Sequence, residues 1–404
     1  MHALDATPAA LGFRHPAEWE PQSATWLAFP HNQSDYPGKL QPVQWVYGEI
    51  IRKLADRQMV NVVVHDAGVQ TRARTVLRRA GANAERVKFF RHPLNRGWLR
   101  DAGPMFVVRD AGEAATREVA ICKFRFNAWA KYPDFQLDDE LALRLAEQLG
   151  CRVFIPRVEG QPFVLEGGAI DVNGQGVVMV TEECLLDATV QPRNPGVSRS
   201  EIEQALRDTL GVSTTWWLGK GIAGDDTHGH VDDLARFVNP TTILLCDEND
   251  PRDANYAALK ENHERAQDFR LPDGSRPEVI RLPMPRPLTF DGQRLPASYA
   301  NFYIANEMVL APTFNDPADR VALGILSECF PGREVCGIHA VDLVWGLGTL
   351  HCLTHEQPAG RPFDQPDEPP DKPRRARHSR VHHSPQIKYG NGQVARSALG
   401  RPAG

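Results

Sequence analysis

Residues 43–90 read VQWVYGEIIRKLADRQMVNVVVHDAGVQTRARTVLRRAGANAERVKFF, and this stretch decides the fold class. Apolar residues recur at helical spacing over Val43–Asp56 and again over Val69–Ala80. Met59–Val64 and Val87–Phe90 are short runs rich in β-branched or aromatic residues, which predict strands. The order helix, strand, helix, strand is typical of an α/β fold.

The same alternation continues along the chain. Further helices are predicted at Asp138–Leu149, Ser200–Leu210, Asp253–Phe269 and Pro317–Phe330. Further strands are predicted at Glu118–Cys122, Val177–Val180 and Thr241–Cys246. Asp138 and Ser200 are the predicted N-caps, and Glu203 predicts a capping box with Ser200. The length of 404 residues fits two or three domains or one large closed α/β domain.

Charge is unevenly distributed. The formal charge of the chain is −5, but residues 361–404 hold nine Lys and Arg against four Asp and Glu, which leaves about −10 on the rest. This acidic body is poorly suited to nucleic acid, because binding to a phosphate backbone depends on Lys and Arg. It favours a cationic small molecule as the ligand.

Several features bear on location. No run of about 18 apolar residues predicts a membrane span, and the first residues lack the pattern of a secretory signal. The seven cysteines are scattered singly, which indicates reduced thiols in a cytoplasmic protein instead of a disulfide framework or zinc site. Residues 363–404 are rich in Pro, Arg and His and predict a disordered tail. A basic anchor for an acidic partner is the alternative for that tail.

Two short segments place a carboxylate beside glycine. Trp98–Pro104 (WLRDAGP) contains Asp101 just before the predicted strand Met105–Val108, where it either caps a turn or faces a substrate. Leu165–Gly168 (LEGG) contains Glu166 after an apolar run, so this carboxylate faces either a surface bend or a pocket.

The segment Asp225–Asp233 (DDTHGHVDD) is the densest cluster of titratable groups in the sequence. In an extended stretch, His228, His230 and Asp232 would point to one face. A His and an Asp there can serve as a proton carrier and a holder of a cation. The alternatives are a solvated acidic turn and a binuclear zinc site, although Asp233 stands where the zinc motif requires a third His.

A cysteine follows a glycine-rich bend in Val344–Thr354 (VWGLGTLHCLT). Cys352 is either a buried structural thiol or a nucleophile, since a glycine-rich bend gives access to the sulfur. Together with His230 and the acidic residues, it completes the set of groups that a thiol enzyme requires.

Taken in order, these segments resemble the agmatine deiminase family, which includes bacterial-type peptidyl-arginine deiminases and belongs to the guanidino-group-modifying (pentein) superfamily. The resemblance covers nearly all of residues 10–362. The segments that carry it are Pro16–His31, Trp98–Pro104, Phe126–Tyr132, Leu165–Gly168, Thr181–Leu186, Gly229–Asp232, Leu350–Thr354 and Glu356–Ala359.

The resemblance implies one catalytic domain at residues 10–362, an α/β-propeller of five ββαβ-like units around a pseudo-fivefold axis. It also implies hydrolysis of a guanidino group to a ureido group with release of ammonia, without a metal or organic cofactor. For agmatine the product is N-carbamoylputrescine, an intermediate of putrescine and polyamine metabolism. The expected partner is a small cationic guanidino substrate, and a homo-oligomer stays open.

The resemblance also implies roles for particular residues. Cys352 is the nucleophile, and His230 is the acid and base. Asp101 and Asp232 hold the guanidinium, because carboxylates accept paired N–H bonds from this planar cation. Glu166 is placed beside His230. Trp98 and Gly348 are the further predicted substrate-binding residues.

The chain departs from the family pattern at two places. Gly346–Leu350 replaces a glycine run that ends in Asn before Ile-His-Cys, and the segment after Trp129 lacks the Gly-Gly often found before Lys-Tyr. These departures leave open whether agmatine, free arginine or peptidyl-arginine is the substrate. A metal-dependent hydrolase and a catalytically silent binding module are the more distant alternatives.

Overall fold

The structure is a computed structural model that describes residues 6–111 and 116–363. Helices and strands alternate along these residues, so the predicted α/β class is confirmed. All six predicted helices are present, with ends within a few residues of the predicted ones. They are α1 (Leu40–Ala55), α2 (Ala67–Ala80), α4 (Gln136–Leu149), α6 (Arg199–Leu210), α7 (Tyr256–Ala266) and α8 (Ala318–Cys329).

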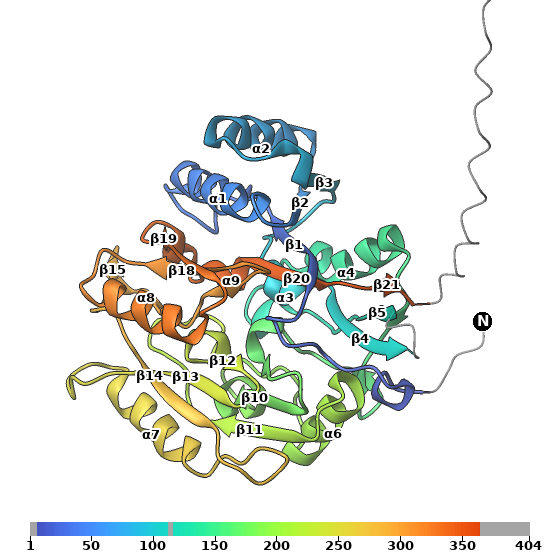
Figure 1. Ribbon diagram of the computed structural model, residues 1–404, viewed down its shortest axis with the longest axis vertical. Coiled ribbons are helices and arrows are strands. Elements are labelled where there is room, and N and C mark those ends of the chain that lie inside the picture. Colours follow the sequence, from blue (N-terminus) through green and yellow to red (C-terminus); the bar gives the residue numbers. More distant parts are fainter. Residues whose placement is uncertain (1–5, 112–115, 364–404) are drawn as a thin grey trace, which may run out of the picture. The chain divides into compact units, whose positions relative to one another are not determined.

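Three short helices interrupt the loops between strands: α3 (Leu99–Ala102), α5 (Glu182–Leu186) and α9 (Leu350–Leu353). The longer helices lie toward the periphery of the described unit, whereas α3 and α9 lie near its middle (Figure 1). The predicted nucleophile Cys352 belongs to α9, and Asp101 belongs to α3. Two motifs far apart in sequence therefore meet in the interior.

The strands form several separate sheets, and no closed barrel is found among the described residues. In the first sheet, β1 (Gln22–Ala28) pairs in antiparallel with β20 (Thr354–Pro358) and in parallel with β2 (Met59–Val64), which pairs with β3 (Val87–Arg91). Trp26 lies opposite His355 in this register. Because β20 follows α9 directly, this pairing fixes the backbone beside Cys352.

The other larger sheets repeat this order of an antiparallel neighbour, a central strand and a parallel neighbour. A helix connects the central strand of each of these sheets to the parallel neighbour that follows it next in sequence, as a parallel crossover requires. Their strands are β4 (Met105–Ala111), β5 (Thr116–Cys122), β6 (Val153–Phe154) and β21 (Arg361–Pro362); β9 (Asp171–Val172), β10 (Val177–Thr181) and β11 (Thr214–Leu218); β12 (Ala235–Asn239), β13 (Thr242–Asp247) and β14 (Glu278–Pro283); and β17 (Tyr303–Ile304), β18 (Met308–Thr313) and β19 (Glu334–His339).

Two small hairpins complete the strands: β7 (Arg157–Val158) with β8 (Gln161–Pro162), and β15 (Thr289–Phe290) with β16 (Gln293–Arg294). The six strands predicted from sequence correspond to β2, β3, β4, β5, β10 and β13. Except in β3, which lies at the edge of its sheet, their side chains are mostly buried, and all five residues of β10 are inaccessible. This explains why these strands read as nearly continuous apolar runs.

Both predicted N-caps are wrong. Asp138 lies within the first turn of α4, and its carboxylate accepts the backbone N–H groups of Asn95 and Arg96 at 2.8 and 3.0 Å. The cap of α6 is Ser198, which forms a capping box with Glu201. The Ser-x-x-Glu spacing occurs twice in this segment, at Ser198–Glu201 and at Ser200–Glu203. The backbone at Ser198 is extended, so the first of these two serine residues caps the helix.

The predicted tail at 363–404 lies outside the described residues from residue 364 onward. The predicted domain boundaries therefore stay a prediction. Within the part of the chain that the structure describes, no helix combines the length and the apolar character needed to cross a bilayer.

Candidate active site

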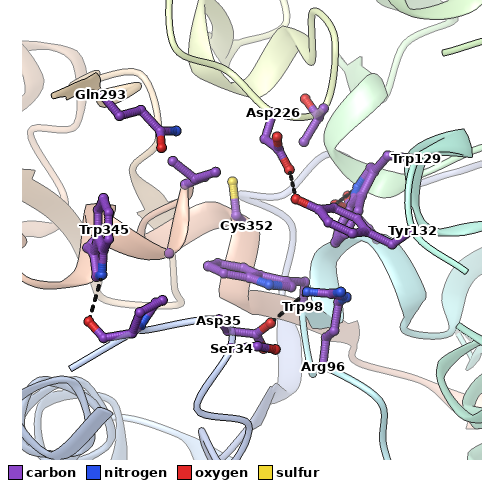
Figure 2. Close-up of a pocket in the computed structure, with 15 residues that line it drawn as sticks. Ser34, Asp35, Arg96, Trp98, Trp129, Tyr132, Asp226, Gln293, Trp345 and Cys352 are labelled. Carbon is purple, nitrogen blue, oxygen red and sulfur yellow. Dashed lines mark hydrogen bonds and ion pairs between the residues drawn. The ribbon is translucent and has the colours of Figure 1, made fainter. Parts of the chain in front are cut away.

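A cavity of about 190 Å³ lies beside α9. Figure 2 shows the Cys352 sulfur pointing into it, with Gln293 and Trp345 on one side and Trp129 and Tyr132 on the other. The lining residues come from segments distant in sequence: Ser34, Asp35, Pro37, Arg96, Trp98, Asp101, Trp129, Tyr132, Asp226, Thr227, Gln293, Trp345, Gly346, Leu347 and Cys352.

Cys352 is held at the wall of this cavity by Asn301. The Asn301 side-chain amide donates a hydrogen bond to the Cys352 sulfur at 3.0 Å, and its oxygen accepts the backbone N–H of Cys352 at 3.3 Å. Burial raises the pKa of the thiol well above its ordinary value, and the charges of Asp232, Asp233 and Asp101 raise it further. The thiol is therefore neutral in the empty site at neutral pH.

The Asp101 carboxylate lines the cavity and is oriented from both sides. Its two oxygens accept hydrogen bonds from the Trp129 indole N–H at 2.9 Å and from the backbone N–H of Gly168 at 3.0 Å. Burial is the main cause that raises the pKa of Asp101 to about 6, although the nearby His230 lowers it. Gly168 is required here because a Cβ would lie only 2.4 Å from the His230 ring.

His230 lies behind Asp101 and is inaccessible to solvent. Its Nδ1 is 3.8 Å from Asp101 Oδ1, and its Nε2 is 3.7 Å from Glu166 Oε2. Burial lowers the pKa of His230, but the charge of Asp101 and the neighbouring Cys184 and Glu166 side chains outweigh burial, so the pKa is raised well above its ordinary value. His230 is thus an imidazolium that can donate a proton.

Glu166 is fully buried in an ion pair. The Arg193 guanidinium donates to its carboxylate at 2.9 Å, and neither side chain is accessible. Burial raises the pKa of Glu166, but Arg193 and His230 together lower it to about 2. Glu166 is therefore a permanent negative charge beside His230.

Asp232 lies behind Cys352. Its Oδ2 accepts a hydrogen bond from His351 Nδ1 at 2.7 Å and lies 3.6 Å from the Cys352 sulfur. Burial raises the pKa of Asp232, but the hydrogen bond and charge of His351 lower it below its ordinary value. The other oxygen, Oδ1, is buried and has no hydrogen-bond partner among the described residues.

The expected extended stretch through Asp225–Asp233 is wrong. His228 has a positive φ of 65° and turns away to pair with Asp187 at 2.7 Å, and a short 3₁₀ helix covers Val231–Asp233. Asp225 accepts the backbone N–H groups of Gly229 and His230, which stabilises this turn. Consequently His228 does not share a face with His230 and Asp232.

Two groups of donor atoms within the described part of the chain are close enough to surround one ion. Neither group includes His228: one combines Glu166, Cys184 and His230, and the other combines Asp232, Asp233 and Cys352. The zinc arrangement considered for His228, His230 and Asp232 is therefore not formed.

The family model for Porphyromonas-type peptidyl-arginine deiminases matches residues 14–358. The chain belongs to this family. An agmatine deiminase from Pseudomonas putida is 36% identical over 382 residues, which cover 89% of this chain and 99% of that relative. Membership in the peptidyl-arginine deiminase family, together with such relatives, makes the protein a hydrolase that acts on C–N bonds.

Solved structures of related enzymes have the same fold. The agmatine deiminase of Enterococcus faecalis matches with a TM-score of 0.79 and 31% identity, over 88% of this chain and 98% of that chain. A C. jejuni agmatine deiminase with substrate bound matches with a TM-score of 0.75 and 27% identity, over 86% and 97% of the two chains.

Three of the predicted site residues of this peptidyl-arginine deiminase family member line the cavity, namely Trp98, Asp101 and Cys352. His230, Asp232 and Glu166 are buried behind them. Gly348 does not line the cavity. It packs between the site residues instead, since a Cβ there would lie 2.9 Å from the Trp98 ring and 3.0 Å from Cys352 Cβ.

Several residues at the site were not predicted. Asn301 and Asp233 contact each other at 3.0 Å beside Cys352. Asp35, Arg96 and Asp226 line the cavity. Asp35 follows the Pro16–His31 motif closely and Asp233 follows Asp232 directly, so proximity to the motifs was the available signal. Asn301 carried no such signal.

Proposed function

We propose that this protein hydrolyses agmatine to N-carbamoylputrescine and ammonia through a covalent intermediate on Cys352. The observation that carries the proposal is the position of the Cys352 thiol at the wall of a cavity, with the carboxylates of Asp101 and Asp232 beside it. A guanidinium between these carboxylates presents its central carbon to the sulfur.

In the proposed reaction, the substrate's positive charge favours loss of the thiol proton to solvent, since it offsets the carboxylates that raise the pKa of the thiol. The thiolate of Cys352 then forms a bond to the guanidinium carbon and gives a tetrahedral adduct. The His230 imidazolium gives a proton to the departing nitrogen, and ammonia leaves when its C–N bond breaks. A thiouronium remains on Cys352.

Water completes the proposed cycle. Neutral His230 removes a proton from a water molecule, whose oxygen forms a bond to the thiouronium carbon. The carbon–sulfur bond then breaks. The proton of the new hydroxyl passes to the departing Cys352 sulfur, so the ureido product and the free thiol form. Asp232 keeps its hydrogen bond from His351 and Glu166 keeps its ion pair with Arg193 throughout, and no metal or organic cofactor takes part in the proposed reaction.

The charges of the cavity support agmatine over arginine. Asp35, Asp101 and Asp226 line it, and Arg96 is the cation among its lining residues. Arg96 is already paired with Asp35 at 2.9 Å and Asp134 at 3.0 Å. An arginine carboxylate would therefore meet no uncommitted cation there, whereas the second amine of agmatine is itself a cation.

Deimination of free or peptidyl arginine is the second candidate, because the matching family is described by peptidyl-arginine deiminases. The two candidates share the same residues and differ only at the far end of the substrate.

Two further features of the proposal concern the whole molecule. The repeated order of antiparallel neighbour, central strand, helix and parallel neighbour supports five ββαβ-like units around a pseudo-fivefold axis within residues 10–362. All seven cysteines carry free thiols, which supports a reducing, cytoplasmic location.

The test is incubation of the purified protein with agmatine, arginine and an arginyl peptide, followed by ammonia detection and product identification. Agmatine is expected to give N-carbamoylputrescine, with and without a metal chelator. The C352S variant is expected to give none, while the matched control C336S, which changes a thiol on β19, keeps the activity. Citrulline as the main product would favour the second candidate, and no ureido product from any substrate would contradict both.

A further inference from the structure

His351 precedes the nucleophile and lies between two carboxylates. Its Nδ1 is 2.7 Å from Asp232 Oδ2, and its Nε2 is 2.7 Å from Glu18 Oε2. All three side chains are buried. Each of these short contacts requires one proton between nitrogen and oxygen, and a neutral imidazole has only one N–H group. With both carboxylates ionised, His351 therefore donates from both nitrogens.

The far end of this chain of side chains is rigidly anchored. Glu18 Oε2 also accepts hydrogen bonds from Arg236 at 2.9 Å and from Arg100 at 3.3 Å. Arg236 lies on β12, and Arg100 lies on α3 next to Asp101. Burial raises the pKa of Glu18, but Arg236, His351 and Arg100 lower it to about 2. Glu18 is thus a fixed anion against which the His351 ring is held.

The other end of this chain of side chains is Asp232, the carboxylate that is proposed to bind the substrate. His351 occupies Oδ2 of Asp232, while Oδ1 is buried and has no hydrogen-bond partner among the described residues. A buried oxygen without a partner is costly unless something else fills its hydrogen-bonding capacity. A guanidinium N–H is a donor of the required kind.

We infer that His351 is a positioning residue for substrate binding: the chain Glu18–His351–Asp232 holds the Asp232 carboxylate ionised and turned so that Oδ1 faces the guanidinium. This inference rests on the proposed function, in which Asp232 binds that cation. It assigns the binding strength of Asp232 partly to Glu18, which does not line the cavity.

The surroundings of Asp232 are strongly charged. Besides His351, the charges of His230 and Arg236 favour its ionised form, and Asp232 in turn acts on neighbours from other elements. The groups that feel its charge include Arg100, Asp101, Asp233 and Cys352. Removal of His351 takes away the largest of the favourable contributions and leaves burial, which raises the pKa of Asp232.

Two substitutions of the same residue separate positioning from simple structural support. The amide nitrogen of Asn can occupy the place of the ring Nδ1, whereas that of Gln can occupy the place of Nε2. His351→Asn thus keeps a donor for Asp232, and His351→Gln keeps one only for Glu18.

With agmatine as substrate, H351Q is expected to lower kcat/KM by about 100-fold, mainly through KM, because Asp232 loses a charged hydrogen bond. H351N is expected to lose no more than about 10-fold. Asp101 and Asp35, with pKa values raised to about 6 and about 7, set the acid limb of the kcat/KM profile in the wild type. Asp232 must also be ionised to bind the cation, so its raised pKa in H351Q adds a third group to that limb and makes it steeper. The control H355Q changes a neighbouring buried histidine and is expected to leave that limb unchanged.

Other results with the H351N and H351Q variants would contradict the inference. Equal losses in H351N and H351Q, or a loss in kcat with an acid limb of unchanged steepness, would overturn the positioning role. If H351Q does not fold, neutron diffraction of the wild-type protein decides: protons on both ring nitrogens of His351 support the inference, and a bare nitrogen overturns it. A wild-type protein that forms no ureido product would instead refute the proposed function.

Discussion

The side-chain amide of Asn301 bonds to the sulfur of Cys352 over 3.0 Å. The oxygen of the same amide accepts the hydroxyl of Thr349 at 2.8 Å and the backbone N–H of His351 at 3.1 Å. One residue therefore holds the first turn of α9 and also directs a donor at the nucleophile. A hydrogen bond of this kind stabilises a thiolate more than a thiol, and it lowers the thiol pKa against the surrounding carboxylates.

Replacement of Asn301 by Ala is expected to lower kcat/KM for agmatine by about 10- to 100-fold, the range for loss of a hydrogen bond to a charged group of about 1.5–3 kcal/mol. Steady-state kinetics measure this effect. Ser298→Ala is the matched control, because Ser298 contacts the unrelated thiol of Cys246 at 3.4 Å from the same segment. Equal losses in both variants would show that the segment, and not the donor, matters.

The raised pKa of Cys352 predicts slow alkylation in the empty enzyme. The neutral thiol persists through neutral pH, so the rate of iodoacetamide labelling at Cys352 should keep rising beyond the ordinary thiol pKa of 9.0. Asp232→Asn removes a charge that raises this pKa and should therefore speed labelling at pH 7 while it abolishes deimination. Peptide mass spectrometry at Cys352 provides the measurement.

Asp226→Asn is the control for this labelling experiment, since Asp226 lines the cavity but is not among the largest causes of the raised thiol pKa. Its labelling profile should match that of the wild type. Slower labelling in Asp232→Asn would contradict the electrostatic picture.

Asp35 is expected to recognise the second amine of agmatine. Burial is the main cause that raises its pKa to about 7, although Arg96 lowers it. The carboxyl becomes charged as the pH rises through that value, so KM for agmatine should fall between pH 6 and pH 8. Asp35→Asn should raise KM by about 5- to 10-fold and remove this pH dependence. An alkylguanidine without a second amine should not distinguish the variant from the wild type.

The buried pair of Glu166 and Arg193 should contribute to stability. Arg193→Met leaves the Glu166 charge buried without its partner, which costs about 3–5 kcal/mol in the free energy of unfolding. Urea unfolding at pH 7 measures this loss. The double variant with Glu166→Gln should recover part of it, because no uncompensated charge remains. A double variant less stable than the single one would contradict this coupling.

The same pair gives a pH dependence with a definite sign. The pKa of Glu166 falls from 4.5 to about 2 on folding. Its stabilising contribution is therefore complete above pH 4.5 and is lost as the pH falls from 4.5 toward 2. Unfolding curves of wild type and Glu166→Gln should converge over that range.

The α/β class was predictable because the two periodicities are strong in the segments that form α1, β2, α2 and β3. The helix caps were not, since two Ser-x-x-Glu spacings compete before α6 and only the backbone at Ser198 decides between them. The role of Asp138 was likewise not predictable from its local sequence. Its backbone partners, Asn95 and Arg96, lie about forty residues away in sequence.

At the site, short motifs predicted the reactive side chains but not how they are held. Cys352 and Asp101 each stand in a glycine-containing motif, which singled them out. Asn301 lies in the largely apolar segment Ala297–Ile304, so nothing in the pattern set it apart. His228 was grouped wrongly with His230 because an extended backbone was assumed where Asp225 stabilises a turn.

The central claim is a covalent bond between Cys352 and the guanidino carbon. Rapid mixing of wild-type protein with agmatine, acid quenching and mass spectrometry of the peptide that contains Cys352 test it directly. A transient mass increase on Cys352 equal to agmatine less ammonia is expected in the wild type, and none is expected in Cys352→Ser. An enzyme that turns over agmatine without this adduct, or a Cys352→Ser variant that still forms N-carbamoylputrescine, would contradict it.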